Sequence, residues 1–287
     1  MAALLQPPQP QTPVRTIQVG DHRLAYRRVG EGSGPAVLLL HGITTSSFLW
    51  AGVLRERAAL AGLDLVALDL LGCGASDKPL DVSYALRDHA ARLPVFLDAL
   101  GLERVHLVGH DLGGGIAQIT AVRHPARVRS LALLNCVGYD HWPVQPITSL
   151  RTPIVRQLLL AAIDAGALTL IVKRALFHRA LVTPALMADF LAPLATAEGR
   201  KAFVHFARCL DNGNLTELIP DLKRLAVPTT VLWGLADVFL TFAIAERLVA
   251  DIPGARLVRL PTAGHFSPID EPGLVAAALR AHFDAAG

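Results

Sequence analysis

The stretch Gly109-His110-Asp111-Leu112-Gly113 follows the apolar run Arg104–Val108 and opens a helical segment that Pro125 ends. Glycines two residues before and two residues after Asp111 fit a tight strand-to-helix turn, because such a turn brings backbone segments together and strains the central residue. The turn raises that central side chain above the sheet, and here it is a carboxylate. Taken alone, the five residues are equally compatible with a plain glycine-rich turn and a solvated Asp, so the surrounding pattern has to decide.

Eight strand-like runs surround this turn along the chain. Arg15–Val19 and Arg23–Arg28 flank Gly20-Asp21 and predict an antiparallel hairpin. The other six runs are short, apolar and typical of buried parallel strands: Ala36–Leu40, Asp64–Asp69, Arg104–Val108, Ser130–Cys136, Thr229–Trp233 and Arg256–Leu260. Helical segments alternate with them at Phe48–Ala61, Leu86–Leu100, Gly113–His124, Thr241–Ala250 and Leu274–Phe283. The sequence therefore predicts an α/β fold whose eight-stranded, mostly parallel sheet carries helices on both faces.

The alternation is interrupted once, after the sixth strand. Between Cys136 and Thr229 no strand-like run appears, and helical segments recur over Pro153–Ala165, Leu168–His178, Pro184–Ala195 and Glu198–Leu210. We expect these helices to form a lid over the crevice where parallel sheets bind ligands. The expected domains are a disordered, Pro- and Gln-rich tail at residues 1–13, a core at residues 14–139 and 223–287, and the helical lid at residues 140–222.

The composition excludes several function classes. The 287 residues are 52% hydrophobic and 18% charged with a net charge of +3, and the basic residues do not gather into a stripe, so nucleic acid is not an expected partner. No apolar stretch reaches the ~20 residues of a membrane span, so no membrane partner is expected either. Three widely spaced cysteines argue against disulfides or a zinc site and suit a cytoplasmic protein. The oligomeric state is left open.

Two further residues stand where a reaction centre at the turn would need them. Asp237 comes just after the run Thr229–Trp233, and His265 comes after the next run, 28 residues later. The order nucleophile, acid, histidine is that of hydrolases with a raised nucleophile at such a turn. Backbone N–H groups of Ile43, after His41-Gly42, and of Leu112 are expected to form an oxyanion hole. If Asp237 is not the acid that orients His265, Asp140 is the next candidate for that role.

The motifs resemble those of the α/β-hydrolase fold family, and specifically its aspartate-nucleophile branch of epoxide hydrolases and haloalkane dehalogenases. The resemblance spans about residues 20 to 285 and rests on the turn at Asp111, on Asp237 and His265, and on two further stretches, His41–Trp50 and Asp69–Pro79. It implies an α/β-hydrolase sheet and catalysis without a metal or organic cofactor. Asp111 would attack a saturated carbon to form an alkyl ester, and a water deprotonated by His265, oriented by Asp237, would hydrolyse that ester.

The leaving group is harder to assign, because the chain departs from both patterns. Dehalogenases of this kind usually hold the halide with a Trp after the nucleophile and often an Asn after His-Gly, where this chain has Leu112 and Ile43. Epoxide hydrolases usually show a Pro where this chain has Thr44, and use lid tyrosines as donors. Side chains that could donate to the leaving group here are Tyr139, Trp142, His178 and His205.

Epoxide hydrolysis to a diol is the main expectation, since a tethered alkoxide needs only one donor while both customary halide donors are missing. Haloalkane dehalogenation is the alternative. A noncatalytic ligand-binding protein, or a nonhydrolytic enzyme with the same pocket, is a further alternative. The apolar lid segments, which include Leu158–Leu160, Leu168–Val172, Phe190, Phe203 and Phe206, indicate a small apolar substrate.

Overall fold

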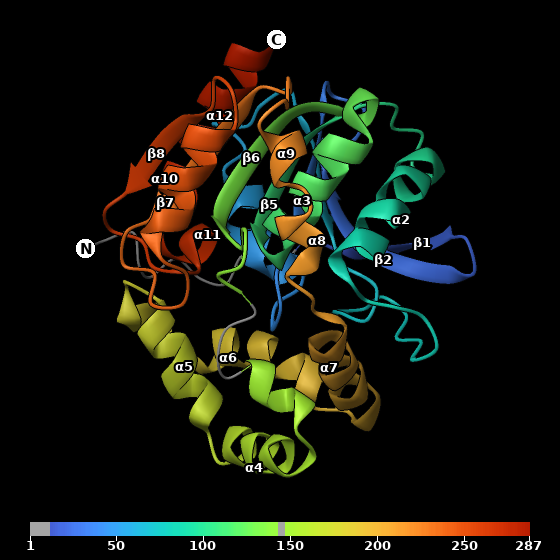
Figure 1. Ribbon diagram of the computed structural model, residues 1–287, viewed down its shortest axis with the longest axis vertical. Helices are drawn as coiled ribbons and strands as arrows, with labels where there is room; N and C mark the ends of the chain where they lie inside the picture. The colour runs from blue at the N-terminus through green and yellow to red at the C-terminus, as the bar shows by residue number, and fades with distance from the viewer. Residues whose placement is uncertain (1–11, 143–146) are drawn as a thin grey trace.

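The computed structural model describes residues 12–142 and 147–287. Most of the tail predicted over residues 1–13 therefore lies outside the described residues. The described chain forms one eight-stranded sheet in the order β1-β2-β4-β3-β5-β6-β7-β8. Only β1 and β2 pair antiparallel to their neighbours, and β3 to β8 run parallel. The predicted sheet with helices on both faces is confirmed (Figure 1).

The strand boundaries follow the predicted runs closely. The strands are β1 Val14–Val19, β2 His22–Val29, β3 Ala36–Leu40, β4 Asp64–Leu68, β5 Val105–Asp111, β6 Val128–Cys136, β7 Thr229–Gly234 and β8 Arg256–Leu260. The largest difference is at β5, which continues beyond the predicted end at Val108 as far as Asp111. The strand thus delivers Asp111 itself to the carboxyl edge of the sheet.

The centre of the sheet is apolar on both faces because side chains alternate along each strand. In β3, Leu38 and Leu40 pack into one hydrophobic cluster, whereas Val37 and Leu39 pack into the other. Helices α2 (Leu86–Ala99), α3 (Leu112–Arg123) and α10 (Phe242–Asp251) cover the first face, while α1 (Ala51–Arg55) and α12 (Pro272–Ala286) cover the second. Strands packed this way form a rigid base for the loops at their carboxyl ends.

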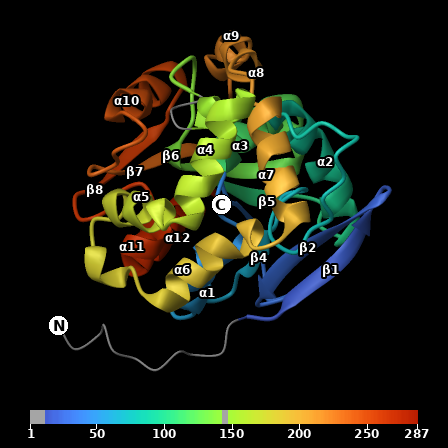
Figure 2. The ribbon, with the colours of Figure 1, turned by 90° about the horizontal axis from the view of Figure 1, so that it is seen from below.

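Six helices lie between β6 and β7 in the described chain. They are α4 Pro153–Asp164, α5 Ala167–Ala175, α6 Pro184–Leu191, α7 Ala197–Cys209, α8 Gly213–Thr216 and α9 Ile219–Leu222. Helices α4 to α7 lie together beyond the sheet in Figure 1 and across its edge in Figure 2. Helices α8 and α9 instead contact α3 of the core. We call residues 147–210, which contain α4 to α7, the helical insertion.

A short α11 (Ser267–Asp270) separates β8 from α12 and begins two residues after His265. In the described residues, no single helix has the length and apolar character of a membrane span. Helices α4 and α5 meet that test only as a pair bent by 81°.

Candidate active site

The turn at Asp111 has the strained geometry that its glycines imply. Asp111 ends β5 with φ 52° and ψ −122°, and α3 begins at Leu112. A Cβ on Gly109 would lie 2.4 Å from the carbonyl oxygen of Gly113, and a Cβ on Gly113 would lie 2.5 Å from that of His41. Both positions therefore require glycine, because the backbone segments approach too closely for any side chain. The result is a carboxylate presented at the edge of the sheet.

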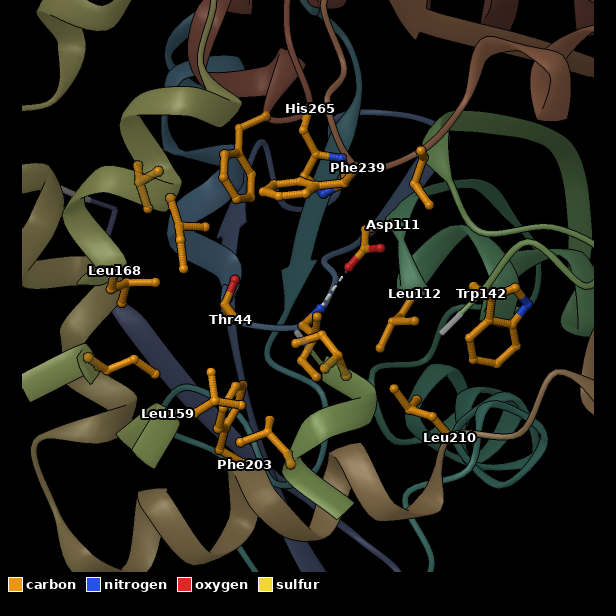
Figure 3. A pocket seen from close by; sticks show the side chains of 18 of the residues that line it. Thr44, Asp111, Leu112, Trp142, Leu159, Leu168, Phe203, Leu210, Phe239 and His265 are labelled. Atoms are coloured by element: carbon orange, nitrogen blue, oxygen red, sulfur yellow. Dashed lines mark hydrogen bonds between the residues drawn. The ribbon is translucent and has the colours of Figure 1, made fainter. Parts of the chain in front are cut away.

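Backbone N–H groups hold the Asp111 carboxylate from below. The N–H of Ile43 donates to Oδ2 at 3.0 Å, the bond drawn as a dashed line in Figure 3. A Cβ on Gly42 would lie 2.1 Å from the same oxygen, so the carboxylate sits directly over that glycine. Burial raises the pKa of Asp111, while His265 and the backbone N–H groups of Leu112 and Ile43 oppose that rise. The two predicted oxyanion-hole donors thus both act on this carboxylate.

Asp237 and His265 form a buried hydrogen-bonded pair. The loop after β7 places Oδ2 of Asp237 2.9 Å from Nδ1 of His265. Burial disfavours both charged forms, but the pair's mutual attraction outweighs it and holds the pKa of Asp237 below and that of His265 above their ordinary values. Asp140, the fallback acid, is exposed at the start of the segment after β6. The structure therefore brings Asp237, rather than Asp140, to His265.

Two backbone contacts fix the loop that carries His265. Its backbone N–H donates to the carbonyl oxygen of Ala175, the last residue of α5, at 2.9 Å. His110, beside Asp111 in the turn, has Nε2 2.8 Å from the carbonyl oxygen of His265. Burial lowers the pKa of His110 to about 3, so this ring is neutral and its Nε2–H is the donor. Sequence analysis did not assign His110 a role, and the structure makes it a support for the His265 backbone.

A partly open cavity of about 140 Å³ lies between these loops and the helical insertion. Its lining is almost entirely aliphatic and aromatic, and it includes Leu159, Leu168, Phe203, Leu210, Phe239 and Phe266. Polar side-chain atoms reach the described lining only from Asp111, His265, Thr44 and Trp142. Figure 3 shows Asp111 at the wall of this cavity with the insertion residues Leu159 and Phe203 opposite.

The predicted leaving-group donors are engaged elsewhere. Tyr139 donates its hydroxyl to Asp251 at 3.1 Å, and Trp142, although its ring lines the cavity, donates Nε1–H to the carbonyl oxygen of Tyr139 at 3.2 Å. His178 pairs with Glu271 at 2.9 Å, and His205 contacts the carbonyl oxygen of Val82 at 2.8 Å. Within the described lining, Tyr139, His178 and His205 are absent from the cavity. The structure therefore does not bring these donors to Asp111.

Sequence analysis did not propose Thr44 as a site residue. Its side chain points into the cavity (Figure 3), and its backbone adopts φ 66°, a left-handed conformation that β-branched residues rarely take. Its neighbour Thr45 donates its hydroxyl to the carbonyl oxygen of Gly42 at 3.0 Å. Thr44 makes no comparable side-chain bond among the described residues. The replacement of the customary Pro was the only sequence signal at this position.

A model of the α/β hydrolase fold matches residues 35–272. The chain belongs to the α/β-hydrolase fold family. Haloalkane dehalogenase 2 of Mycobacterium tuberculosis is 32% identical over 303 residues, covering 96% of this chain and 98% of that protein. The resemblance predicted from the motifs is thus confirmed, including its dehalogenase-like branch, and this α/β hydrolase is an enzyme of the hydrolase class.

Solved structures support the same branch of the α/β-hydrolase fold family. A putative ancestral haloalkane dehalogenase, AncHLD2, is 29% identical, with a TM-score of 0.81 over 95% of this chain and 99% of that chain. Haloalkane dehalogenase DbeA from Bradyrhizobium elkani is 26% identical, with a TM-score of 0.80 over 96% of this chain and 99% of that chain.

Proposed function

We propose that this α/β hydrolase releases halide from small apolar haloalkanes through an ester on Asp111. The observation that carries the proposal is the chemistry of the cavity: a buried carboxylate at the sheet edge faces an almost wholly apolar space. A carboxylate attacking an ester carbonyl would give a reactive anhydride, whereas attack on a saturated carbon gives a stable alkyl ester. Displacement at saturated carbon is therefore the reaction that suits Asp111.

The first step is alkylation of Asp111. Oδ2 is already bound by the N–H of Ile43, which leaves Oδ1 to attack the carbon that bears the halogen. A carbon–oxygen bond forms, the carbon–halogen bond breaks, and its electron pair leaves with the halide. Oδ2 becomes the carbonyl oxygen of the ester, and the Ile43 and Leu112 N–H groups then face the atom on which negative charge develops in the next step.

The second step is hydrolysis of the ester. Nδ1 of His265 is taken by Asp237, so Nε2 is the nitrogen that accepts a proton from water. The hydroxide attacks Cγ of Asp111, the bond between Cγ and the ester oxygen Oδ1 breaks, and Oδ1 leaves in the alcohol with the proton returned by His265. One water is consumed, and one alcohol, one halide and one proton are released. Asp237 stabilises the imidazolium formed in this step.

The choice of halide over epoxide rests on the leaving group. An opened epoxide becomes an alkoxide, a strong base that needs a proton from an acid, whereas a halide leaves as a stable anion. The side chains that would have supplied such an acid, Tyr139, His178 and His205, bond elsewhere. Three relatives of matching length are named haloalkane dehalogenases, which favours the same alternative. Epoxide hydrolysis, the main expectation from the sequence, becomes the second candidate.

The test compares halide release with diol formation and looks for the ester. The wild-type enzyme is incubated with butyl bromide, butyl iodide and epoxybutane, and bromide, iodide and diol are measured. His265→Gln should stop turnover and accumulate a protein heavier by the butyl group, located by peptide mapping on the segment with Asp111. The Asp111→Ala variant should show no increase in mass. Faster diol formation than halide release, or no mass gain on substrates the wild-type enzyme converts, contradicts the proposal.

A further inference from the structure

We propose that the hydroxyl of Thr44 donates the hydrogen bond that stabilises the departing halide. The inference rests on the proposed function and adds the residue that meets the leaving group. It also predicts that loss of this hydroxyl slows the release of chloride more than that of bromide or iodide. The observations that carry it are the position of Thr44, its backbone conformation and the engagement of the neighbouring donors Thr45 and Trp142 by other acceptors.

Thr44 stands next in the chain to the residue that holds the attacked carboxylate, and it lines the same cavity as Asp111. Thr44 directly follows Ile43, whose N–H holds the attacked carboxylate at 3.0 Å, and consecutive Cα atoms lie only about 3.8 Å apart. Both residues line the cavity. In Figure 3 the side chains of Thr44 and Asp111 border the same cavity, on either side of the dashed hydrogen bond from Ile43 to Asp111. A halogen leaving in line from Asp111 moves into this same space.

The backbone conformation of Thr44 is unusual for its side chain. Thr44 lines the cavity with a positive φ of 66°. Glycine or asparagine would adopt this conformation more easily than a β-branched residue, so the position holds a hydroxyl-bearing side chain at a conformational cost. Such strain in an enzyme is concentrated at sites that contact ligands. Proline, with φ fixed near −65°, cannot take this conformation at all.

Among the residues of the cavity lining that the structure describes, Thr44 differs from the neighbouring donors because its hydroxyl is not bonded to another acceptor. The Thr45 hydroxyl is bonded to Gly42, and the indole N–H of Trp142 is bonded to Tyr139. The Ile43 and Leu112 N–H groups act on the Asp111 carboxylate, on the side of the carbon opposite the leaving group. Within the described lining, Thr44 is therefore the side-chain donor without another acceptor.

One neutral hydroxyl sets the substrate preference. Thr44 keeps its proton throughout, because a halide is too weak a base to remove it, and only a hydrogen bond forms as the carbon–halogen bond breaks. The negative charge that develops on the leaving atom is most concentrated on chloride, the smallest of the three halides, and least concentrated on iodide. The rate of chloride release therefore depends most on a hydrogen bond to the leaving atom, and the rate of iodide release depends on it least. An active site with a single neutral donor should therefore release iodide and bromide readily and chloride slowly.

The experiment isolates carbon–halogen cleavage in the His265→Gln enzyme, where each alkylation is followed by intact mass. Rates are measured with butyl chloride, bromide and iodide for His265→Gln alone and with Thr44→Val, Thr44→Ser or Thr45→Val added. Thr44→Val keeps the β-branched shape and should slow alkylation by butyl chloride by about 10- to 100-fold, the range for losing a hydrogen bond to a charged acceptor. The rate of alkylation by butyl bromide should fall less, and the rate with butyl iodide should fall least.

The controls separate a hydrogen-bonding role from packing. Thr44→Ser restores the hydroxyl and should restore most of the chloride rate, while Thr45→Val should keep the wild-type ratio of the three rates. Equal rates in Thr44→Val and its parent, or an equal loss with all three halides, overturns the donor role and leaves the proposed function standing. Failure of His265→Gln itself to gain a butyl group from any halide overturns the proposed function instead. Thermal unfolding of each variant checks that the fold is kept.

Discussion

At the residue scale, four hydrogen-bond donors surround the carboxylate of Asp237. Oδ1 accepts the backbone N–H groups of Phe239 and Leu240, and Oδ2 accepts Nδ1–H of His265 and the side-chain amide of Asn135. This shell keeps Asp237 ionised in a buried place and fixes which His265 nitrogen carries a proton. Asn135, the residue before the end of β6, thus supports the carboxylate of Asp237 from the neighbouring strand.

The first prediction at this scale concerns Asp237→Asn. The amide keeps the shape but loses the charge that stabilises the imidazolium, so turnover should fall by about 10²- to 10⁴-fold. Alkylation of Asp111 does not need His265, so the ester should accumulate on intact protein while steady-state halide release drops. Asp140→Asn, which changes an exposed carboxylate, should behave as the wild-type enzyme. The reverse pattern, with Asp140→Asn inactive and Asp237→Asn active, would assign the acid to Asp140.

The second prediction concerns pH. His265 must be unprotonated to accept a proton from water, and its pKa is raised above 6.5, so ester hydrolysis should be lost as the pH falls through a value above 6.5. Alkylation needs only ionised Asp111, whose pKa burial raises above its ordinary value. In His265→Gln the pH profile of alkylation should therefore follow the ionisation of Asp111 and lack the loss that protonation of His265 causes in wild-type turnover. Coincident pH profiles for the two reactions would contradict this assignment.

At the element scale, the end of α5 is joined to the His265 loop by Asp270 of α11. The Asp270 carboxylate accepts backbone N–H groups from Gly264 at 2.8 Å, Phe177 at 3.0 Å and His178 at 2.9 Å. A Cβ on Gly264 would lie 2.2 Å from the carbonyl oxygen of Ala175, so the two segments are in direct backbone contact. The helical insertion thus shares its anchoring point with the histidine of the site.

Substitution of Asp270 tests this junction. Asp270→Ala leaves three backbone donors without their charged acceptor, and we expect a loss of about 2–4 kcal/mol in the free energy of unfolding. Urea denaturation measures it. Asp284→Ala, which removes an exposed carboxylate paired with Arg280 on α12, is the matched control and should change stability by less than about 0.5 kcal/mol. Equal effects of the two substitutions would show that Asp270 does not hold the junction.

At the scale of the whole molecule, the cavity exists only where the sheet edge meets the helical insertion. Ile43, Asp111 and His265 line it from the core, and Leu159, Leu168 and Phe203 line it from the insertion. Its volume of about 140 Å³ is close to the roughly 150 Å³ of a cavity that accepts benzene. Substrates of about that size should fit, and longer alkyl chains should require the insertion to move.

Enlarging the insertion side should shift the substrate preference. Phe203→Ala removes an aromatic ring opposite Asp111, so the rate with octyl bromide should rise relative to the rate with butyl bromide. The truncation should also lower the free energy of unfolding, by about 3–5 kcal/mol at most. Leu170→Ala removes a side chain that is 71% exposed on α5 and should leave the ratio unchanged. Bromide release with both substrates checks the prediction. An unchanged ratio in Phe203→Ala would place the limit on chain length elsewhere.

The sequence by itself determined the features that local pattern encodes. Short apolar runs and intervening helical periodicity predict the parallel sheet, since burial on both faces requires continuous apolar strands. The glycines around Asp111 predict the tight turn, since only glycine allows the backbone approach seen there. The interrupted alternation after Cys136 predicts the helices between β6 and β7. The family resemblance is confirmed, and the roles of Asp111, Asp237 and His265 stay predictions that the geometry supports.

Only the tertiary structure decided which polar groups are free to meet a substrate. Tyr139, His178 and His205 are equally plausible donors in the sequence, but each bonds a partner 112, 93 or 123 residues away. Thr44 shows the converse, because nothing in its neighbours predicts a left-handed backbone that turns its hydroxyl inward. The physical reason is that buried polar groups pair with whatever the fold brings within hydrogen-bond distance, and that proximity is set by chain packing across the whole molecule rather than by local sequence.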